Sequence, residues 1–190
     1  MKITLRELKK YNFEGLDETI KIFGVGILDT EVTPIDILKY IGIKDAIWCL
    51  YAFKYRDYCL FLADVAESVL HIFEDEYPND NRPRKAIEGI RLYHTGKVDK
   101  DELGIYATAA YAATADAATA AYATAVSTAG VALAAASSSY YAIAYGTSDA
   151  SAYCAFDAAS ASVYYAADTT TAAREKKWKE IEELFIKHFE

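Results

Sequence analysis

Charged side chains that could bind an anion or pair with one another are concentrated in residues 57–91. They are Asp57, Asp64, Glu67, Asp80, Arg82, Arg84 and Arg91. Asp57, Asp64 and Glu67 share nearly one face of a predicted helix, because they are seven and three residues apart. Two arginines follow a predicted turn, where an antiparallel helix would return beside the first. The spacing therefore predicts that carboxylates and guanidinium groups meet across a helical hairpin.

This cluster has two interpretations. In the first, bidentate arginine–carboxylate pairs fix the hairpin, since partly buried arginines usually occur paired. In the second, Arg82 or Arg84 lines a polar pocket and binds a phosphate or carboxylate, whose geometry suits a guanidinium fork. The sequence leaves both interpretations open. The candidate binding residues are Arg82, Arg84, Arg91, Asp64, Glu67 and Asp80.

A second group of candidates lies in an Ala-, Ser-, Thr- and Tyr-rich tract. Between Glu102 and Arg174 the chain contains no Lys, Arg or Glu, and its formal charges are Asp116, Asp149, Asp157 and Asp168. These aspartates are either exposed helix residues or pocket carboxylates, of which Asp116 and Asp157 are the candidates. The tyrosines fill space between Ala-rich helices, or they stack on a planar ligand or a partner. The candidates for that contact are Tyr140, Tyr141 and Tyr145.

Signatures of catalysis are missing from the sequence. His71, His94 and His188 lack the spacing of a metal site, and no nucleophile elbow, phosphate-binding loop or dinucleotide fingerprint occurs. We therefore expect a protein that is not an enzyme and that has no cofactor and no metal.

Helical signals run along most of the chain, and no segment is securely predicted as a strand. Thr33-Pro34 combines a hydroxyl N-cap with a proline in the first turn, and Gly42 suits the end of that helix. Residues 77–81 predict a turn. Helices are expected at about 34–41, 45–53, 57–74, 83–96, 99–130, 131–145, 149–167 and 170–189.

These elements predict an all-α protein with one domain, residues 1–190. Short amphipathic helices in residues 1–104 would pack on Ala/Tyr-rich antiparallel helices in residues 105–190, and the last helix would close the core.

Charge and composition narrow the class of partner. The chain has 20 basic and 28 acidic residues, a net charge of −8, and no strongly basic region. A nucleic-acid polymer is therefore a poor partner, whereas a basic protein would be attracted. The uncharged stretch 117–148 is long enough to span a bilayer, but its Ala, Thr, Ser and Tyr content argues against insertion. Three cysteines without a C-x-x-C pair, and no apolar signal core at the N-terminus, favour the cytoplasm.

The segment Asp80-x-Arg82-Pro83-Arg84-x-Ala86-Ile87-Glu88, followed by an Ala-rich tract and the helix opening Arg174-Glu175-Lys176-Lys177-Trp178, carries a family resemblance. The chain resembles the small proteins labelled putative immunity proteins, which occur in bacteria and in phages. The aromatic segment Ile47-Trp48-Cys49-Leu50-Tyr51 also resembles a part of that family. Family members often carry Trp and Arg in the Ala-rich tract, where this chain has Tyr and no Arg.

The resemblance implies a binding protein, and it leaves three hypotheses. The first is an immunity-type inhibitor that neutralises a toxin or effector by direct binding. The second is a phage-encoded anti-defence protein that sequesters a nucleotide immune signal, with tyrosines that stack and Arg82, Arg84 or Arg91 on the phosphates. The third is a homo-oligomer formed through Ala faces.

Overall fold

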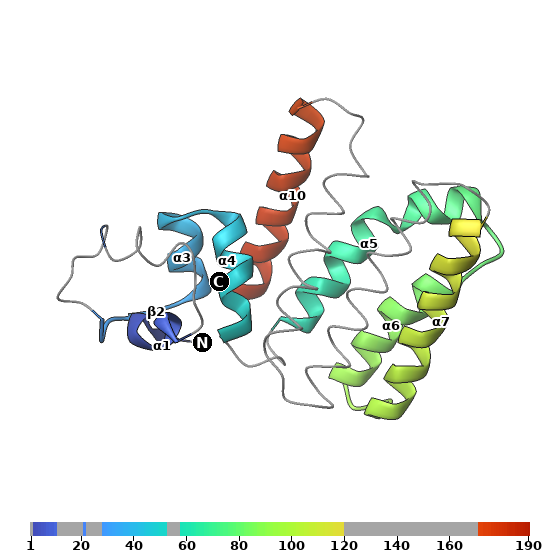
Figure 1. The fold of residues 1–190 in the computed structure, drawn as a ribbon, viewed down its shortest axis with the longest axis horizontal. Coiled ribbons are helices and arrows are strands. Elements are labelled where there is room, and N and C mark those ends of the chain that lie inside the picture. Colours follow the sequence, from blue (N-terminus) through green and yellow to red (C-terminus); the bar gives the residue numbers. More distant parts are fainter. Residues whose placement is uncertain (1, 11–20, 22–27, 53–57, 120–170) are drawn as a thin grey trace.

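The computed structural model describes residues 2–10, 21, 28–52, 58–119 and 171–190. These residues are mostly helical, which confirms the predicted all-α class (Figure 1). The elements in chain order are β1 (Ile3–Thr4), α1 (Leu5–Lys9), β2 (Glu31–Val32), α3 (Pro34–Tyr40), α4 (Ile43–Cys49), the 3₁₀ turn η1 (Leu50–Ala52), α5 (Cys59–Glu76), α6 (Arg82–His94), α7 (Lys100–Thr119) and α10 (Thr171–Phe189).

A two-stranded antiparallel sheet near the N-terminus was not predicted. Ile3 pairs with Val32 and Thr4 pairs with Glu31. Each strand has two residues, which is too short for the alternation that marks a strand in a sequence. Helix α1 begins directly after β1, and the Thr4 hydroxyl accepts a hydrogen bond from the Glu7 amide in a capping box.

Helix α3 begins as the sequence predicts. The Thr33 hydroxyl accepts a hydrogen bond from the Asp36 amide at 3.1 Å, and the Asp36 carboxylate accepts one from the Thr33 amide at 2.8 Å. Gly42 follows with φ of 126°, a conformation that side-chain-bearing residues rarely adopt. Gly42 therefore ends α3 and lets α4 begin at the next residue but in a new direction.

Helices α5, α6 and α7 pack in chain order, α5 on α6 and α6 on α7. Figure 1 places α7 at the outer edge of this group. The expected turn at 77–81 joins α5 to α6, and the observed helix ends lie within two residues of the predicted ones. Helices α6 and α7 approach closely where Gly89 meets the Tyr106 ring, because a Cβ on Gly89 would lie 2.5 Å from Tyr106 Cδ2.

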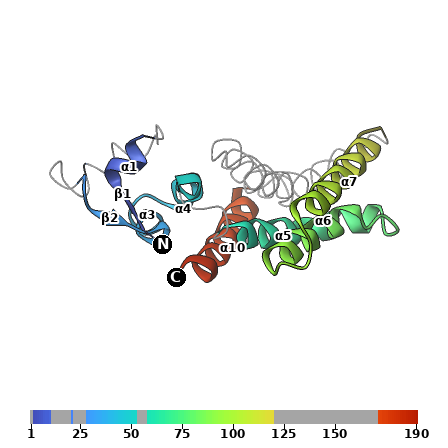
Figure 2. The same cartoon turned by 90° about the horizontal axis from the view of Figure 1, so that it is seen from below.

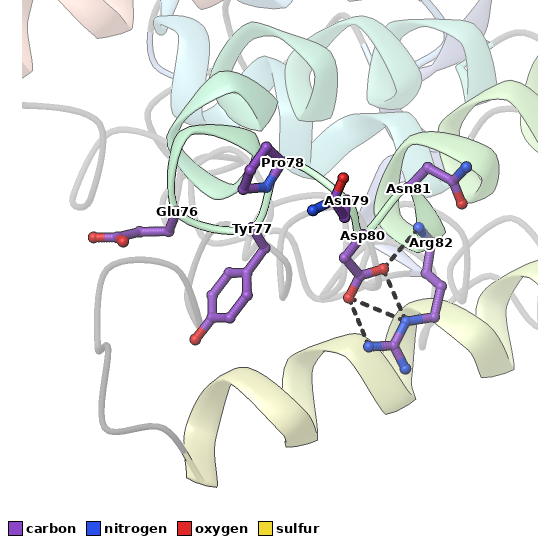
Figure 3. Close-up of a pocket in the computed structure, with 7 residues that line it drawn as sticks. All are labelled: Glu76, Tyr77, Pro78, Asn79, Asp80, Asn81 and Arg82. Atoms are coloured by element: carbon purple, nitrogen blue, oxygen red, sulfur yellow. Dashed lines mark hydrogen bonds and ion pairs between the residues drawn. The ribbon is translucent and has the colours of Figure 1, made fainter.

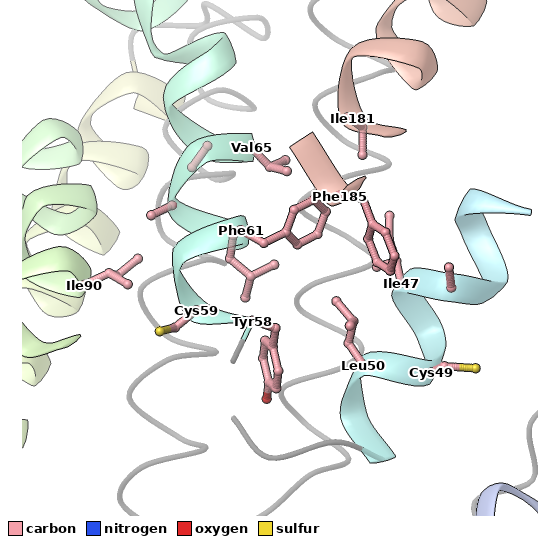
Figure 4. Packing of buried hydrophobic residues seen from close by; sticks show 14 of the residues in the cluster. Ile47, Cys49, Leu50, Tyr58, Cys59, Phe61, Val65, Ile90, Ile181 and Phe185 are labelled. Atoms are coloured by element: carbon pink, nitrogen blue, oxygen red, sulfur yellow. The ribbon is translucent and has the colours of Figure 1, made fainter. Parts of the chain in front are cut away.

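Helix α10 closes the hydrophobic core, as expected for residues 170–189. It contacts α3 and α4 on one side and α5 on another, so it lies between the N-terminal elements and the hairpin (Figures 1 and 2). The Phe61 ring meets the Phe185 ring edge-on at 5.5 Å and the Phe189 ring at 5.8 Å. Figure 4 shows Phe61 and Phe185 at the centre, with Ile47 and Leu50 facing them.

The remaining predicted elements lie outside the described residues. These are the end of the helix that was expected to reach residue 130 and the helices at about 131–145 and 149–167. The division into 1–104 and 105–190 within one domain stays a prediction.

Candidate functional site

The turn between α5 and α6 holds the first ion pairs of the predicted cluster. Arg82 Nε donates to Asp80 Oδ1 at 2.9 Å, and Arg82 Nη2 donates to Asp80 Oδ2 at 2.6 Å (Figure 3). The same Nη2 donates to Asp116 Oδ2 of α7 at 2.8 Å. The hydrogen bond from Arg82 holds the pKa of Asp80 below its usual value, and both carboxylates raise the pKa of Arg82. Arg82 thus ties the turn to α7.

Two residues further along α6, Arg84 points back to the end of α5. Its Nε and Nη2 donate to Glu74 Oε1 and Oε2 at 2.5 and 2.6 Å, the bidentate arrangement that a guanidinium fork favours. Glu67 Oε1 lies 3.8 Å from Arg84 Nη1. Donation to the Glu74 carboxylate raises the pKa of Arg84 above its ordinary value. Glu74 is a partner that the sequence analysis did not name.

In the last turn of α6, far from the turn of the hairpin, Arg91 bridges two carboxylates of α5. Arg91 Nη2 lies 2.7 Å from Asp64 Oδ1 and 2.6 Å from Glu67 Oε2. The hydrogen bond that Arg91 donates to Glu67 is the largest influence that raises the pKa of Arg91. The pairing crosses the hairpin because Arg91 lies twelve residues after Asn79 and Glu67 twelve residues before it.

Asp64 also contacts two side chains of the last helix, an ammonium group and an imidazole. Lys187 Nζ lies 3.0 Å and His188 Nε2 lies 2.9 Å from Asp64 Oδ2. Burial alone would raise the pKa of Asp64, but hydrogen bonds from Arg91, His188 and Lys187 outweigh it and lower the pKa to about 2. Asp64 therefore joins α5, α6 and α10 through one carboxylate.

We call these residues the ion-pair network. Its members are Asp64, Glu67, Glu74, Asp80, Arg82, Arg84, Arg91, Asp116, Lys187 and His188. The structure brings together every predicted candidate of the hairpin, and Asp116 joins them from 34 residues beyond Arg82. Each arginine of the network binds carboxylates of this chain, as the first interpretation of the cluster expects.

The other candidates of the sequence analysis lie outside the described residues. These are Asp57, Tyr140, Tyr141, Tyr145 and Asp157.

The sequence analysis missed Glu74, Lys187 and His188. Glu74 could have been found from the hairpin register, because Glu74 and Arg84 each lie five residues from Asn79. Lys187 and His188 carry no such signal, because their contacts with Asp64 depend on how α10 packs on α5.

The comparison with protein families identifies what kind of chain this is. The model for the family described as "Imm-5 like putative immunity protein" matches residues 54–184. The chain belongs to this family. No curated protein and no solved structure gave a match.

The matched segment includes the hairpin and all three arginines of the network. It begins at Lys54, so the aromatic segment 47–51, which we expected to share the resemblance, lies outside it. Lys187 and His188 lie just beyond its end. The family match therefore covers the α5–α6–α7 group and most of α10, whereas the small N-terminal sheet lies outside it.

A shallow hollow of about 580 Å³ lies beside the α5–α6 turn in this immunity-family protein. It is lined by the turn residues 77–81 and by Glu76 and Arg82, which lie on either side of the turn (Figure 3). The hollow presents the carboxylates of Glu76 and Asp80 and the side-chain amides of Asn79 and Asn81. The charge of Arg82 is balanced by Asp80 and Asp116, to which it is bound. The chemistry of the hollow does not favour an anion.

The described histidines and cysteines do not form a reactive site. Cys59 Sγ lies 3.7 Å from His94 Nδ1, but Cys59 is fully buried. Burial raises the pKa of the Cys49 thiol, which makes it less reactive. Within the part of the chain that the structure describes, no group of three or more His, Cys, Asp and Glu could hold a metal ion. No helix in those same residues is long and apolar enough to cross a membrane.

Proposed function

We propose that this protein is a non-enzymatic immunity protein that neutralises a toxin or effector by binding it directly in the cytoplasm. The observation that carries the proposal is the family membership of residues 54–184 together with the state of the arginines in that segment. Arg82, Arg84 and Arg91 are bound to carboxylates of the same chain. They stabilise the arrangement of the helices, which leaves surface docking as the way to act on another molecule.

Binding of a nucleotide through these arginines is the weaker alternative. A phosphate would have to displace Glu74 from Arg84, or Asp64 and Glu67 from Arg91, and would leave those carboxylates without their counter-ions. The net charge of −8 adds a general repulsion for a polyanionic ligand. The same charge favours association with a basic protein.

Co-expression with a panel of bacterial toxin domains tests the proposal. We expect the protein to restore growth against a toxin of the panel, and we expect native mass spectrometry of the purified pair to give a stoichiometric complex. Native spectra of the protein with cyclic and linear nucleotides test the alternative in parallel. A nucleotide adduct without rescue from any toxin would contradict the proposed function.

A further inference from the structure

Helix α7 has an exposed face whose composition is unusual for a protein surface. Exposed positions along one side of the helix, which we call the α7 face, are Asp101, Ile105, Thr108, Tyr111, Ala112, Ala115 and Asp116, and Lys100 and Glu102 are exposed on either side of Asp101 in the sequence. Ile105 is 66% exposed and Tyr111 is 64% exposed, the two largest values among exposed large hydrophobic side chains of the described residues. Between Glu102 and Asp116 the helix carries no charge at all.

The position of α7 explains why this face has no cover from α6. Helix α7 packs on α6 through the opposite side, where Leu103, Ala107, Ala110 and Ala113 are buried. With 3.6 residues per turn, those positions and the α7 face fall on opposite arcs of the helix. Figure 2 shows α7 at the edge of the α5–α6–α7 group. An outer face of this kind would ordinarily carry charged side chains.

The sizes and charges of the side chains on the α7 face indicate what kind of partner segment could bind it. Thr108, Ala112 and Ala115 form a low strip that lets another backbone approach closely, and Ile105 and Tyr111 stand on either side of it. Asp101 lies at one end, and Asp116, whose side chain is 70% exposed beside Arg82, lies at the other. The pattern is an apolar centre with acidic ends, which is complementary to an apolar segment with basic ends.

A second copy of this chain is a poorer match than a basic segment. In a parallel pair each aspartate would face its own equivalent, which opposes self-association. In an antiparallel pair centred on Thr108, Asp116 of one copy would lie opposite the exposed Lys100 of the other, but Asp101 would lie opposite Ala115, next to Asp116. A dimer that grows with concentration in native mass spectrometry would overturn the choice of a basic partner.

We propose that the α7 face is the docking surface for the protein partner, and that the partner presents a basic amphipathic segment to it. Ile105 and Tyr111 enter the apolar stripe of that segment, and its Lys or Arg side chains meet Asp101 and Asp116. The inference rests on the proposed function, because it assigns the surface through which neutralisation takes place.

A synthetic probe tests the chemistry of the surface without knowledge of the partner. The probe is an amphipathic helical peptide of leucine and lysine, about five turns long, and its control carries glutamate in place of lysine. We expect the lysine peptide to bind the full chain in fluorescence anisotropy and the glutamate peptide not to bind. Ile105→Asp should weaken binding by about tenfold, as expected for a central apolar contact. Tyr40→Asp, at another exposed large hydrophobic residue, which lies on α3, should leave binding unchanged.

The aspartate substitution separates docking from simple charge attraction. Ile105→Asp adds a negative charge, so nonspecific adsorption of a cationic peptide would become stronger. Binding that strengthens, or that both variants lose equally, would overturn the proposal. A drop in the thermal midpoint of Ile105→Asp relative to Tyr40→Asp would also overturn it, because the chain itself would then cover the face.

The toxin panel distinguishes this inference from the proposed function. If the wild type neutralises a toxin and Ile105→Asp still does, the function stands and the assignment of the surface fails. If the wild type neutralises no toxin, the proposed function fails and the assignment of the face to its partner fails with it. Loss of neutralisation by Ile105→Asp, with Tyr40→Asp fully active, is the expected result.

Discussion

Replacing Asp64 with asparagine should destabilise the protein in a way that depends on pH. Asp64 Oδ1 accepts from Arg91, and Oδ2 accepts from Lys187 and His188, so one carboxylate joins three helices. Asparagine keeps the shape of the side chain but removes its charge. Arg91 retains Glu67 as a partner, whereas the contact of α10 with this point of α5 is weakened.

The magnitude follows from the pKa of Asp64, which falls from 3.8 to about 2 on folding. At about 1.4 kcal/mol for each pH unit, this difference corresponds to about 2 kcal/mol of stability at neutral pH. The network lies at the surface, where water screens charges, so we reduce the expected loss for Asp64→Asn to about 1–2 kcal/mol.

The sign of the pH dependence follows from the lowered pKa. A carboxylate whose pKa is lower in the folded state contributes fully above its unfolded value, here near 4, and the contribution disappears as the pH falls to about 2. The difference between wild type and Asp64→Asn should therefore be full at pH 7 and about half as large at pH 3.

Urea unfolding followed by circular dichroism at pH 7, 5 and 3 measures this difference. Asp75→Asn is the matched control, because Asp75 lies exposed on the same helix. The control should change the free energy of unfolding by less than about 0.5 kcal/mol. A loss for Asp64→Asn that is as large at pH 3 as at pH 7, or no loss at pH 7, would refute the electrostatic argument.

Three further predictions concern packing and reactivity. Gly89→Ala should destabilise by about 1–3 kcal/mol in urea unfolding, although alanine favours helices, because its Cβ would collide with the Tyr106 ring; combination with Tyr106→Ala should recover part of the loss. Phe185→Ala should cost about 3–5 kcal/mol in the same assay, since its ring is fully buried against α5. Cys49 should resist iodoacetamide in the native state and react after unfolding, as read by peptide mass spectrometry, because burial raises the pKa of its thiol.

The helices could be predicted where the sequence carries local signals. Thr33 and Pro34 marked the start of α3, and the turn at 77–81 marked the hairpin, because caps and turns depend on neighbouring residues. The sheet of Ile3–Thr4 and Glu31–Val32 could not be predicted in the same way. Its pairing joins residues far apart in sequence, and each strand is too short for a periodic pattern.

The ion-pair network could be predicted in part for the same reason. Arg82, Arg84 and Arg91 were found because a hairpin brings its two arms together in a register that the turn determines. The contact of Asp116 with Arg82, and that of Asp64 with His188, arise from the packing of whole helices. In the sequence, Asp116 is one of four aspartates in a tract without basic residues. In the fold, Arg82 at the start of α6 lies beside it.

The network has a further role that its modest strength does not reveal. Partly exposed ion pairs each contribute little stability, about 0–1 kcal/mol. The buried side of α7, however, presents Ala107, Ala110 and Ala113 after Leu103, and these small side chains fix the position of the helix along α6 less firmly than large ones would. The Arg82–Asp116 pair and the close approach of Gly89 to Tyr106 each fit one register alone.

We infer that these two contacts hold α7 in place along its axis. This placement matters for function because the opposite side of the same helix presents Ile105 and Tyr111. A slip of α7 by one turn would move both side chains by about 5.4 Å and would rotate them little, so a partner that contacts other parts of the surface would lose its match. Arg82 would then act on binding indirectly, by fixing where the α7 face lies.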